Sequence, residues 1–413
     1  MKYFNTLTGF FNDTEKTVVN DDIIVTGGYS TVNDGGAGTY VVTLVTADES
    51  DSGIVISGKT FTKGDTQLEL ISDNGEVYVE QFGASSTASA AVNKTAIQAA
   101  VDSGARRVNF RPVQYLVADD IVINHPVDIV GNGAQLVLET DSTSTQLFRV
   151  EYAENTDPAP ASISGMKISG TRVITPPADG ESTETVSYYN TCINLVNISD
   201  FTISNVDFEN CRYAVYAQKT DSVNHILSHI TIKNCNIFSA INGITLYNTN
   251  TVKIQNCKID LNKVGSMGVN LRSNTTNIIV EDVSVLNCIY GIHVFGNTWE
   301  KTIIVSEEES KIIKDATDRY FIKNLLVDGA EKGIYIVKSD IPIHFANIML
   351  VNITGMAIQV AKAENITFTN SSVLMAAPEK CAESAVVLLI NGATNIKFTH
   401  DGAIEPLPGT PET

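Results

Sequence analysis

The chain of 413 residues has few of the features that mark several classes of protein. It contains no apolar stretch long enough for a signal peptide or a membrane span, so we expect a protein made in the cytoplasm, without a signal peptide and without membrane insertion. Only 28 Lys and Arg residues stand against 47 Asp and Glu, giving a formal net charge of −19. Because nucleic-acid phosphates would be repelled by this charge, we expect no nucleic-acid partner.

Cysteine and histidine are also sparse. The 6 cysteines include no CxxC pair, which argues against a disulfide framework and against a zinc site. The 6 histidines are scattered, and the closest pair, His225 and His229, falls in a predicted loop. We therefore expect no metal and no cofactor.

What the sequence does contain is a repeat. An alternating apolar strand, an Asn or Asp, a second strand, a Gly or Ala and a third strand recur seven times, as in "ISNVDF" and "IKNCNI". A period of roughly 20 to 45 residues is typical of a solenoid. The aligned turn residues are Asn205, Asn234, Asn256, Asp282, Asn324, Asn347 and Asn370.

The repeat predicts an all-β, single-stranded parallel β-helix. Alternation with period two and many Val, Ile, Thr and Phe residues indicate strands, and three short strands with turns use about 20 to 30 residues, fewer than a propeller blade. An Asn at a sharp bend tolerates the left-handed conformation and can donate to one rung while accepting from the next. Asp282 can only accept. We therefore predict a structural Asn ladder along the stacked turns.

The pattern divides the chain into four parts. We expect a short N-terminal β module at 1–75, a lead-in strand and capping helix at 76–107, the parallel β-helix at 108–402 and an extended tail at 403–413. The helix is predicted over Ala88–Val101 from its apolar spacing. Insertions that interrupt the period indicate loops near 171–190, 218–228, 297–318 and 376–384. The register also places Cys211 with Cys288, and Cys235 with Cys257, in inward columns of unbridged thiols.

Three segments near the start of the solenoid carry a resemblance to a known family. The runs "VEQFGA", "NKTAIQAAVDSG" and "RRVNFRPVQYLV" resemble the lead-in of the pectin-lyase-like right-handed β-helix superfamily. The upstream run "GGYSTVNDGGAGTYVV" resembles the glycine-rich stretch before that segment in bacteriophage tailspikes and prophage tail proteins. Relatives often carry a Gly-Asp-Gly run before the helix; here the sequence is "GASSTASAAVNKT", so no role of those acids is carried over.

This resemblance implies a right-handed coil and a place in the virion, in the phage tail. It also implies two kinds of partner, a bacterial surface polysaccharide and other virion tail proteins, and assembly as a homotrimer.

The repeat register also names the outward positions of the third strand. One column reads Tyr216, Thr245, Asn270, His293, Tyr335 and Gln359, and a parallel column reads Gln218, Tyr247, Arg272, Phe295, Val337 and Ala361. Rings, amides and an Arg at the rung spacing suit an extended glycan, although stacked aromatic residues also stabilise a sheet. The predicted glycan-binding residues are Tyr216, Tyr247, Asn270, Arg272, His293, Phe295, Tyr335 and, in the longest loop, Trp299.

Catalysis would need further groups. Glu209, Asp260 and Asp328 share an outward column of the middle strand, with Asp260 and Asp328 two rungs, or roughly 10 Å, apart. This separation is near the upper limit for an inverting glycosidase and too wide for a retaining one. Arg272 with His293 forms an alternative set for β-elimination. Three functions stay open: a tailspike-like polysaccharide depolymerase, a non-catalytic structural or receptor-binding phage fibre, and a cellular pectin-lyase-like lyase or hydrolase.

Overall fold

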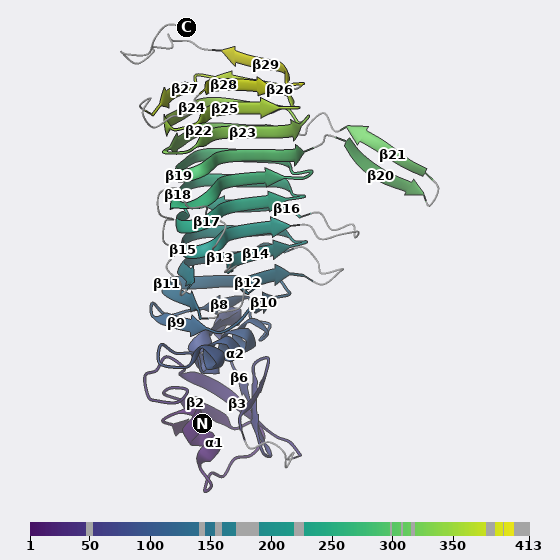
Figure 1. The fold of residues 1–413 in the computed structure, drawn as a ribbon. Coiled ribbons are helices and arrows are strands. Elements are labelled where there is room, and N and C mark those ends of the chain that lie inside the picture. Colours follow the sequence, from purple (N-terminus) through teal and green to yellow (C-terminus); the bar gives the residue numbers. More distant parts are fainter. Residues whose placement is uncertain are drawn as a thin grey trace. The chain divides into compact units, whose positions relative to one another are not determined.

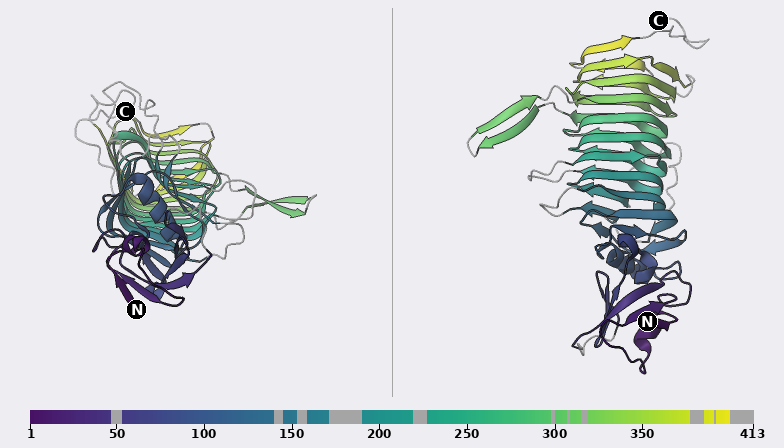
Figure 2. Two further views of the ribbon diagram at one scale, coloured as in Figure 1. Left: turned by 90° about the horizontal axis from the view of Figure 1, so that it is seen from below. Right: turned by 180° about the vertical axis from the view of Figure 1, so that it is seen from behind.

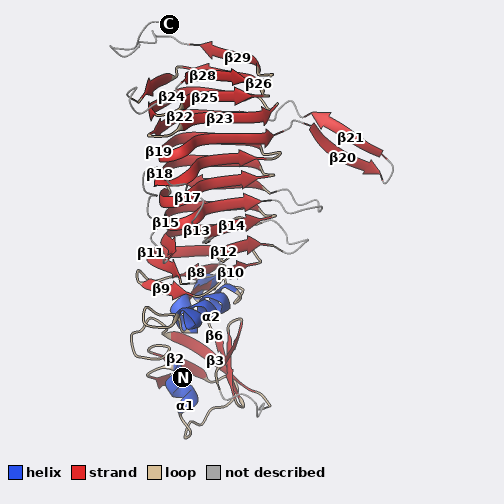
Figure 3. Ribbon diagram, in the orientation of Figure 1, coloured by secondary structure: helices blue, strands red, loops and turns tan. Residues whose placement is uncertain are grey.

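The computed structural model describes residues 1–46, 53–139, 145–152, 159–170, 190–218, 227–297, 300–306, 309–314, 319–376, 385–390 and 392–399. The chain divides into two compact units, Met1–Thr171 and Arg172–Thr413. Both described α-helices belong to the first unit, and the second consists of strands and their turns (Figure 3).

The first unit begins with a six-stranded sheet. Its strands, in spatial order, are β1 (Lys2–Phe4), β2 (Ile23–Thr26), β3 (Gly38–Leu44), β6 (Thr66–Leu70), β5 (Thr60–Lys63) and β4 (Val55–Ser57). Helix α1 (Leu7–Asn12) begins at Thr6, whose hydroxyl accepts a hydrogen bond from the Gly9 amide at 2.9 Å. The rings of Tyr40, on β3, and Phe61, on β5, pack edge to face in the core of the sheet, with 5.6 Å between the ring centres.

The same unit continues into parallel strands. Its elements are η1 (Asp73–Gly75), β7 (Glu76–Tyr78), η2 (Val79–Phe82), α2 (Ala90–Val101), β8 (Arg107–Asn109), β9 (Gln114–Val117), β10 (Ile121–Ile123), β11 (Asp128–Leu138), β12 (Gln146–Glu151) and β13 (Ala161–Gly170). Strand β11 pairs in parallel with β8, β9 and β13, and β10 pairs in parallel with β12.

Helix α2 confirms the predicted capping helix, starting two residues later than expected because Ser89 is its N-cap. The side-chain amide of Gln98 donates to the Val122 carbonyl at 2.9 Å and accepts from the Val122 amide at 2.8 Å. Asn93, also on α2, donates to the Leu116 carbonyl at 3.0 Å. The helix thereby satisfies backbone groups of β9 and β10 that would otherwise form an open strand edge.

The second unit is a stack of parallel strands (Figures 1 and 2). They are β14 (Thr191–Val196), β15 (Ser199–Gln218), β16 (Ser228–Lys233), β17 (Asn236–Tyr247), β18 (Asn250–Arg272), β19 (Thr276–Asn297), β22 (Tyr320–Asp328), β23 (Lys332–Ser339), β24 (Ile343–Ile353), β25 (Met356–Ala361), β26 (Glu364–Thr369), β27 (Ser372–Met375), β28 (Ala385–Ile390) and β29 (Thr394–Thr399). Within the predicted 297–318 insertion, β20 (Glu300–Ser306) and β21 (Glu309–Lys314) form a separate antiparallel pair. The stacking confirms the predicted parallel β-helix.

The core of this unit is built from inward columns of aliphatic residues. Ile244, Val269, Ile292, Ile334 and Ile358 are register partners from β17 to β25, and all are buried. Each such side chain contributes about 1.5 to 3 kcal/mol when it leaves water. The thiols of Cys192, Cys211, Cys235, Cys257 and Cys288 are free and buried, whereas Cys381 lies outside the described residues.

Glycine opens the third strand in successive rungs at Gly243, Gly268, Gly291 and Gly333, with Ala214 and Ala357 at the flanking rungs, and the glycines have a steric cause. A Cβ on Gly268 would lie 2.7 Å from the carbonyl oxygen of Gly291, and one on Gly291 would lie 2.5 Å from that of Gly333. Neighbouring backbones approach too closely at this corner for a larger side chain. The repeated glycine in the sequence register is therefore a packing requirement of the stack.

All seven predicted turn residues adopt the left-handed conformation, with φ between 48° and 55°. Asn234 donates to the Oδ1 of Asn205 at 3.3 Å, and Asn347 donates to the Oδ1 of Asn324 at 3.0 Å. Asn324 in turn donates to the Oδ1 of Asp282 at 2.8 Å. At these three steps the turn side chains bond from rung to rung, and Asp282 acts as an acceptor.

Candidate functional site

The two outward columns of the third strand are continuous in the structure. In the first, Thr245 pairs with Tyr216 and with Asn270, Asn270 with His293, and His293 with Tyr335. In the second, Arg272 pairs with Tyr247 on one side and with Phe295 on the other. Residues matched in the sequence register are therefore neighbours across adjacent rungs.

The residues of these two columns differ in solvent exposure. Thr245, Asn270 and His293 are only 2%, 3% and 7% exposed. Tyr216, Tyr247, Phe295 and Tyr335 are half-buried, and Arg272 is exposed. His293 lies in the outward column, where the sequence register places it, but larger side chains on its own and the next strand cover it. Thr245, Asn270 and His293 form the floor of the face. The half-buried tyrosines of both columns, Phe295 and the exposed Arg272 form its accessible surface.

Four rings gather on β19 and β23. We call Tyr290, His293, Phe295 and Tyr335 the ring cluster. His293 stacks on Tyr335 at 5.3 Å with 10° between the ring planes, and Tyr290 stacks on Tyr335 at 5.3 Å. Phe295 lies 5.9 Å from His293. Stacked rings on a rigid sheet offer apolar faces whose positions are fixed before any ligand arrives.

Tyr290 was not among the predicted residues. It precedes Gly291, whereas the sequence count of outward positions began after that glycine. The chain bends at this corner, so the residues immediately before the glycine form a further column, with Tyr290 paired to Met267 and Lys332. The signal was present in the sequence as the residue preceding each repeated Gly.

Three cations surround the ring cluster. The Lys332 Nζ lies 4.8 Å from the centre of the Tyr335 ring and 5.2 Å from that of Tyr290. Arg272 and Lys338 lie 5.6 Å and 5.8 Å from the centre of the Phe295 ring. These distances fall in the range of cation–π contacts. The sequence analysis included Arg272 but missed both lysines.

His293 is held in one protonation state. Its Nδ1 lies 3.0 Å from the Oδ1 of Asn270, and an amide oxygen only accepts, so the proton sits on Nδ1 and Nε2 carries the lone pair. Burial, with the nearby charges of Arg272 and Lys332, lowers the pKa of His293 to about 4. The imidazole is therefore neutral at neutral pH.

The three predicted catalytic carboxylates share a column on the middle strand, but apolar residues separate them. Phe238 lies between Glu209 and Asp260, and Leu286 lies between Asp260 and Asp328. Asp260 and Asp328 are consequently two rungs, or roughly 10 Å, apart.

Both aspartates also hold turns. The Oδ1 of Asp260 accepts hydrogen bonds from the Asn262 amide and from the Asn287 side chain, each at 3.0 Å. The Oδ1 of Asp328 accepts from the Asn352 side chain at 2.8 Å. Asn262, Asn287 and Asn352 are themselves left-handed, with φ of 51° to 53°. They form a second turn ladder that the sequence analysis did not predict.

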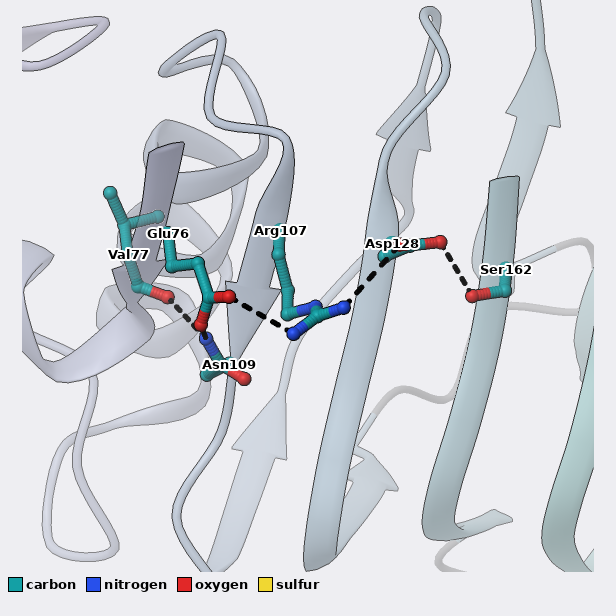
Figure 4. A network of polar contacts seen from close by, with 6 residues as sticks. All are labelled: Glu76, Val77, Arg107, Asn109, Asp128 and Ser162. Carbon is teal, nitrogen blue, oxygen red and sulfur yellow. Dashed lines mark hydrogen bonds and ion pairs between the residues drawn. The ribbon is translucent and has the colours of Figure 1, made fainter. Parts of the chain in front are cut away.

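A second polar column lies in the first unit (Figure 4). Arg107 bridges Glu76, at 3.0 Å, and Asp128, at 4.0 Å, on the two neighbouring strands. Ser162, on the next strand, donates to Asp128 at 2.7 Å. Asn109 donates to the second oxygen of Glu76 at 3.3 Å. Alternating charge at matched register positions stabilises the first parallel strands.

The remaining predictions concern absent features. Among the described residues, no group of three or more His, Cys, Asp and Glu side chains could hold a metal ion. Neither α-helix of the described ranges is long and apolar enough to cross a membrane. Trp299 lies outside the described residues.

Comparison with known proteins agrees with this architecture. The family model for the right handed beta helix region matches residues 162–311. No relative was found among curated protein sequences. The chain therefore has the predicted fold, a right-handed parallel β-helix.

Several solved structures share this fold with the chain, at low sequence identity. A tailspike protein of the Acinetobacter baumannii bacteriophage Fri1, a capsular polysaccharide depolymerase, has a TM-score of 0.55 and 14% identity, over 98% of this chain and 76% of the tailspike. The enzymatically active domain of tailspike protein 4 of bacteriophage CBA120 has a TM-score of 0.58 and 12% identity, over 92% of this chain and 51% of the other.

A third match is WceF of Pantoea stewartii, a glycan biofilm modifying enzyme with a tailspike-like fold, with a TM-score of 0.53 and 10% identity over 98% and 53% of the two chains. The chain therefore has the β-helix fold of phage tailspikes and spans about half to three quarters of these structures.

Proposed function

We propose that the protein is a tailspike-like virion component of a bacteriophage or prophage that binds a bacterial surface polysaccharide on the outward face of its third strands. The observation that carries the proposal is the ring cluster, in which four stacked rings are fixed on a rigid sheet beside an exposed Arg272. Rings that contact sugar faces and polar groups that bond to hydroxyls are what glycan recognition requires. The fold shared with tailspikes supports the same proposal.

Cleavage of the polysaccharide is the second part of the proposal, and two sets of residues compete for it. Hydrolysis would use Asp260 and Asp328, with Glu209 in the same column. Elimination would use the neutral His293, whose Nε2 would take the proton from the sugar carbon next to a carboxylate, while Arg272 neutralises the charge that develops on that carboxylate. The electron pair left on the carbon would form a carbon–carbon double bond and expel the glycosidic oxygen on the neighbouring carbon, which would take up a proton from water. The engaged Oδ1 atoms of both aspartates and the fixed tautomer of His293 favour the second set.

Incubation of the full chain with purified capsular polysaccharides tests both parts. New reducing ends without unsaturated products indicate hydrolysis, and Asp260→Asn should then abolish them. Unsaturated sugars with ultraviolet absorbance indicate elimination, and His293→Gln should then abolish them. Binding without any product leaves a receptor-binding fibre, and absence of binding contradicts the proposal. Assembly as a homotrimer and contacts with other tail proteins belong to the same proposal, and light scattering of the purified chain tests the first.

A further inference from the structure

The cations around the ring cluster differ from other charged groups on the protein. Lys2 pairs with Asp22 at 2.6 Å, Lys323 with Glu281 at 2.7 Å and Arg107 with Glu76 at 3.0 Å. Arg272, Lys332 and Lys338, by contrast, form no ion pair with any residue in the described ranges. In a chain with 47 acids and 28 bases, three unpaired cations on one patch are a local reversal of charge.

The arrangement of these cations follows the strands. Arg272 ends β18 and both lysines lie on β23, so β19 with Tyr290, His293 and Phe295 runs between them. At the spacing of parallel strands, the cations on the two sides are separated by about 10 Å. A ligand lying on the rings would therefore meet positive charge on both sides.

Other charges near the cluster do not cancel this pattern. His293 is neutral, so it neither adds to nor opposes the positive potential. Glu331, which precedes Lys332, is exposed. Burial, and then the charge of Glu331, raises the pKa of the Tyr290 phenol. The carboxylate of Glu331 would repel the acidic groups of an anionic ligand. Arg272 and Lys332 both act on His293 from opposite strands, so their fields overlap at the centre of the cluster.

We propose that this patch selects a polysaccharide with anionic repeat units, in which the rings contact sugar faces while Arg272, Lys332 and Lys338 bind the acidic groups. This inference rests on the proposed polysaccharide-binding function and narrows it to one class of glycan. Arg272 suits planar carboxylates through its forked donors, and the two ammonium groups suit carboxylate or phosphate alike.

Paired ligands test the inference. The full chain is titrated by calorimetry with capsular polysaccharides rich in uronic acid, before and after chemical reduction of their carboxyl groups. Phosphate-bearing glycans are titrated before and after removal of phosphate. The expected result is binding at least about tenfold tighter to the acidic member of one pair, weakening as salt rises toward about 0.5 M because these charges are exposed to screening. The pair that responds identifies the acidic group.

Variants assign the effect to the patch. Lys332→Gln and Lys338→Gln should each lower affinity for the acidic glycan about two- to fivefold, and the triple variant with Arg272→Gln by tenfold or more, with little change for the neutral form. Lys258→Gln is the matched control, since Lys258 is an exposed lysine on the middle strand.

Equal affinity for acidic and neutral forms, or loss in the Lys258 control equal to that in the triple variant, overturns the inference while leaving polysaccharide binding intact. Absence of binding to every glycan instead contradicts the proposed function itself. Lys338 is exposed, so the single Lys338→Gln variant should fold normally. Its affinity therefore tests the inference independently of folding.

Discussion

His293 and Asn270 lie on adjacent rungs, with the imidazole Nδ1 and the amide Oδ1 3.0 Å apart. Burial and the nearby charges of Arg272 and Lys332 keep the histidine neutral, with a pKa lowered to about 4. In the unfolded chain a histidine titrates near about 6.5, so the unfolded state binds more protons between these two pH values.

Protein stability should therefore fall on acidification because of this one group. Between pH 6.5 and 4 the free energy of unfolding should drop by up to about 3 kcal/mol more in the native protein than in His293→Gln. Arg272 and Lys332 are the cations that act on the ring. Chemical denaturation at several pH values measures the difference. Parallel pH profiles for the two proteins would show that His293 is not held neutral.

The Asn ladder should tolerate substitutions in a defined order. Asn324 is left-handed, accepts from Asn347 and donates to Asp282. Asn324→Gly keeps the backbone conformation and loses the hydrogen bonds, costing about 1 kcal/mol. Asn324→Ala adds about 1 kcal/mol of left-handed strain, and Asn324→Asp places a second carboxylate beside Asp282. Thermal unfolding should rank Gly above Ala; the reverse order would contradict a left-handed turn here.

Gly291, in the middle of the glycine column, should not accept even a methyl group. A Cβ on Gly291 would lie 2.5 Å from the Gly333 carbonyl oxygen and 2.6 Å from a Val327 methyl. Gly291→Ala should destabilise the stack by about 1 to 3 kcal/mol through this overpacking. Gly53→Ala, where nothing lies within 4 Å, serves as the control and should change stability by less than about 0.5 kcal/mol. Equal effects of the two changes would contradict the close approach of the strands.

Removing one ring of the cluster should weaken glycan binding without unfolding the protein. Tyr335→Ala deletes a half-buried ring that stacks on both His293 and Tyr290, and should lower affinity about tenfold. Phe321→Ala removes a comparably exposed ring from the first strand of the rung, and should leave binding unchanged. Calorimetric titration with the same polysaccharide compares them. Similar losses in both variants would mean that the ligand does not bind on the third strands.

Sequence reasoning was most successful where periodicity decides the structure. Strand alternation and the repeated Asn place Asn270 beside His293 and Arg272 beside Phe295, and the structure pairs them in this way. Which residues become neighbours depends on the number of residues in each rung. That number is nearly the same from rung to rung, whatever the side chains are. Helix α2 was predictable for a similar reason, since its apolar spacing is local.

Burial and side-chain pairing were less predictable. His293 is covered by rings from its own and neighbouring strands, and no single rung contains that information. Lys332 reaches the rings from β23, in the same column as Tyr290, and that column, before the repeated glycine, was not counted among the outward positions. Asp260 and Asp328 fit a catalytic pattern by spacing, yet the sequence did not reveal that Asn287 and Asn352 donate to them.

The most direct test of the account is a crystal structure of the full chain with a bound oligosaccharide from its receptor polysaccharide. The account predicts sugar rings lying on Tyr290, Phe295 and Tyr335, with an acidic group near Lys332 or Arg272. An oligosaccharide bound instead along the middle strand, over Asp260 and Asp328, would contradict it.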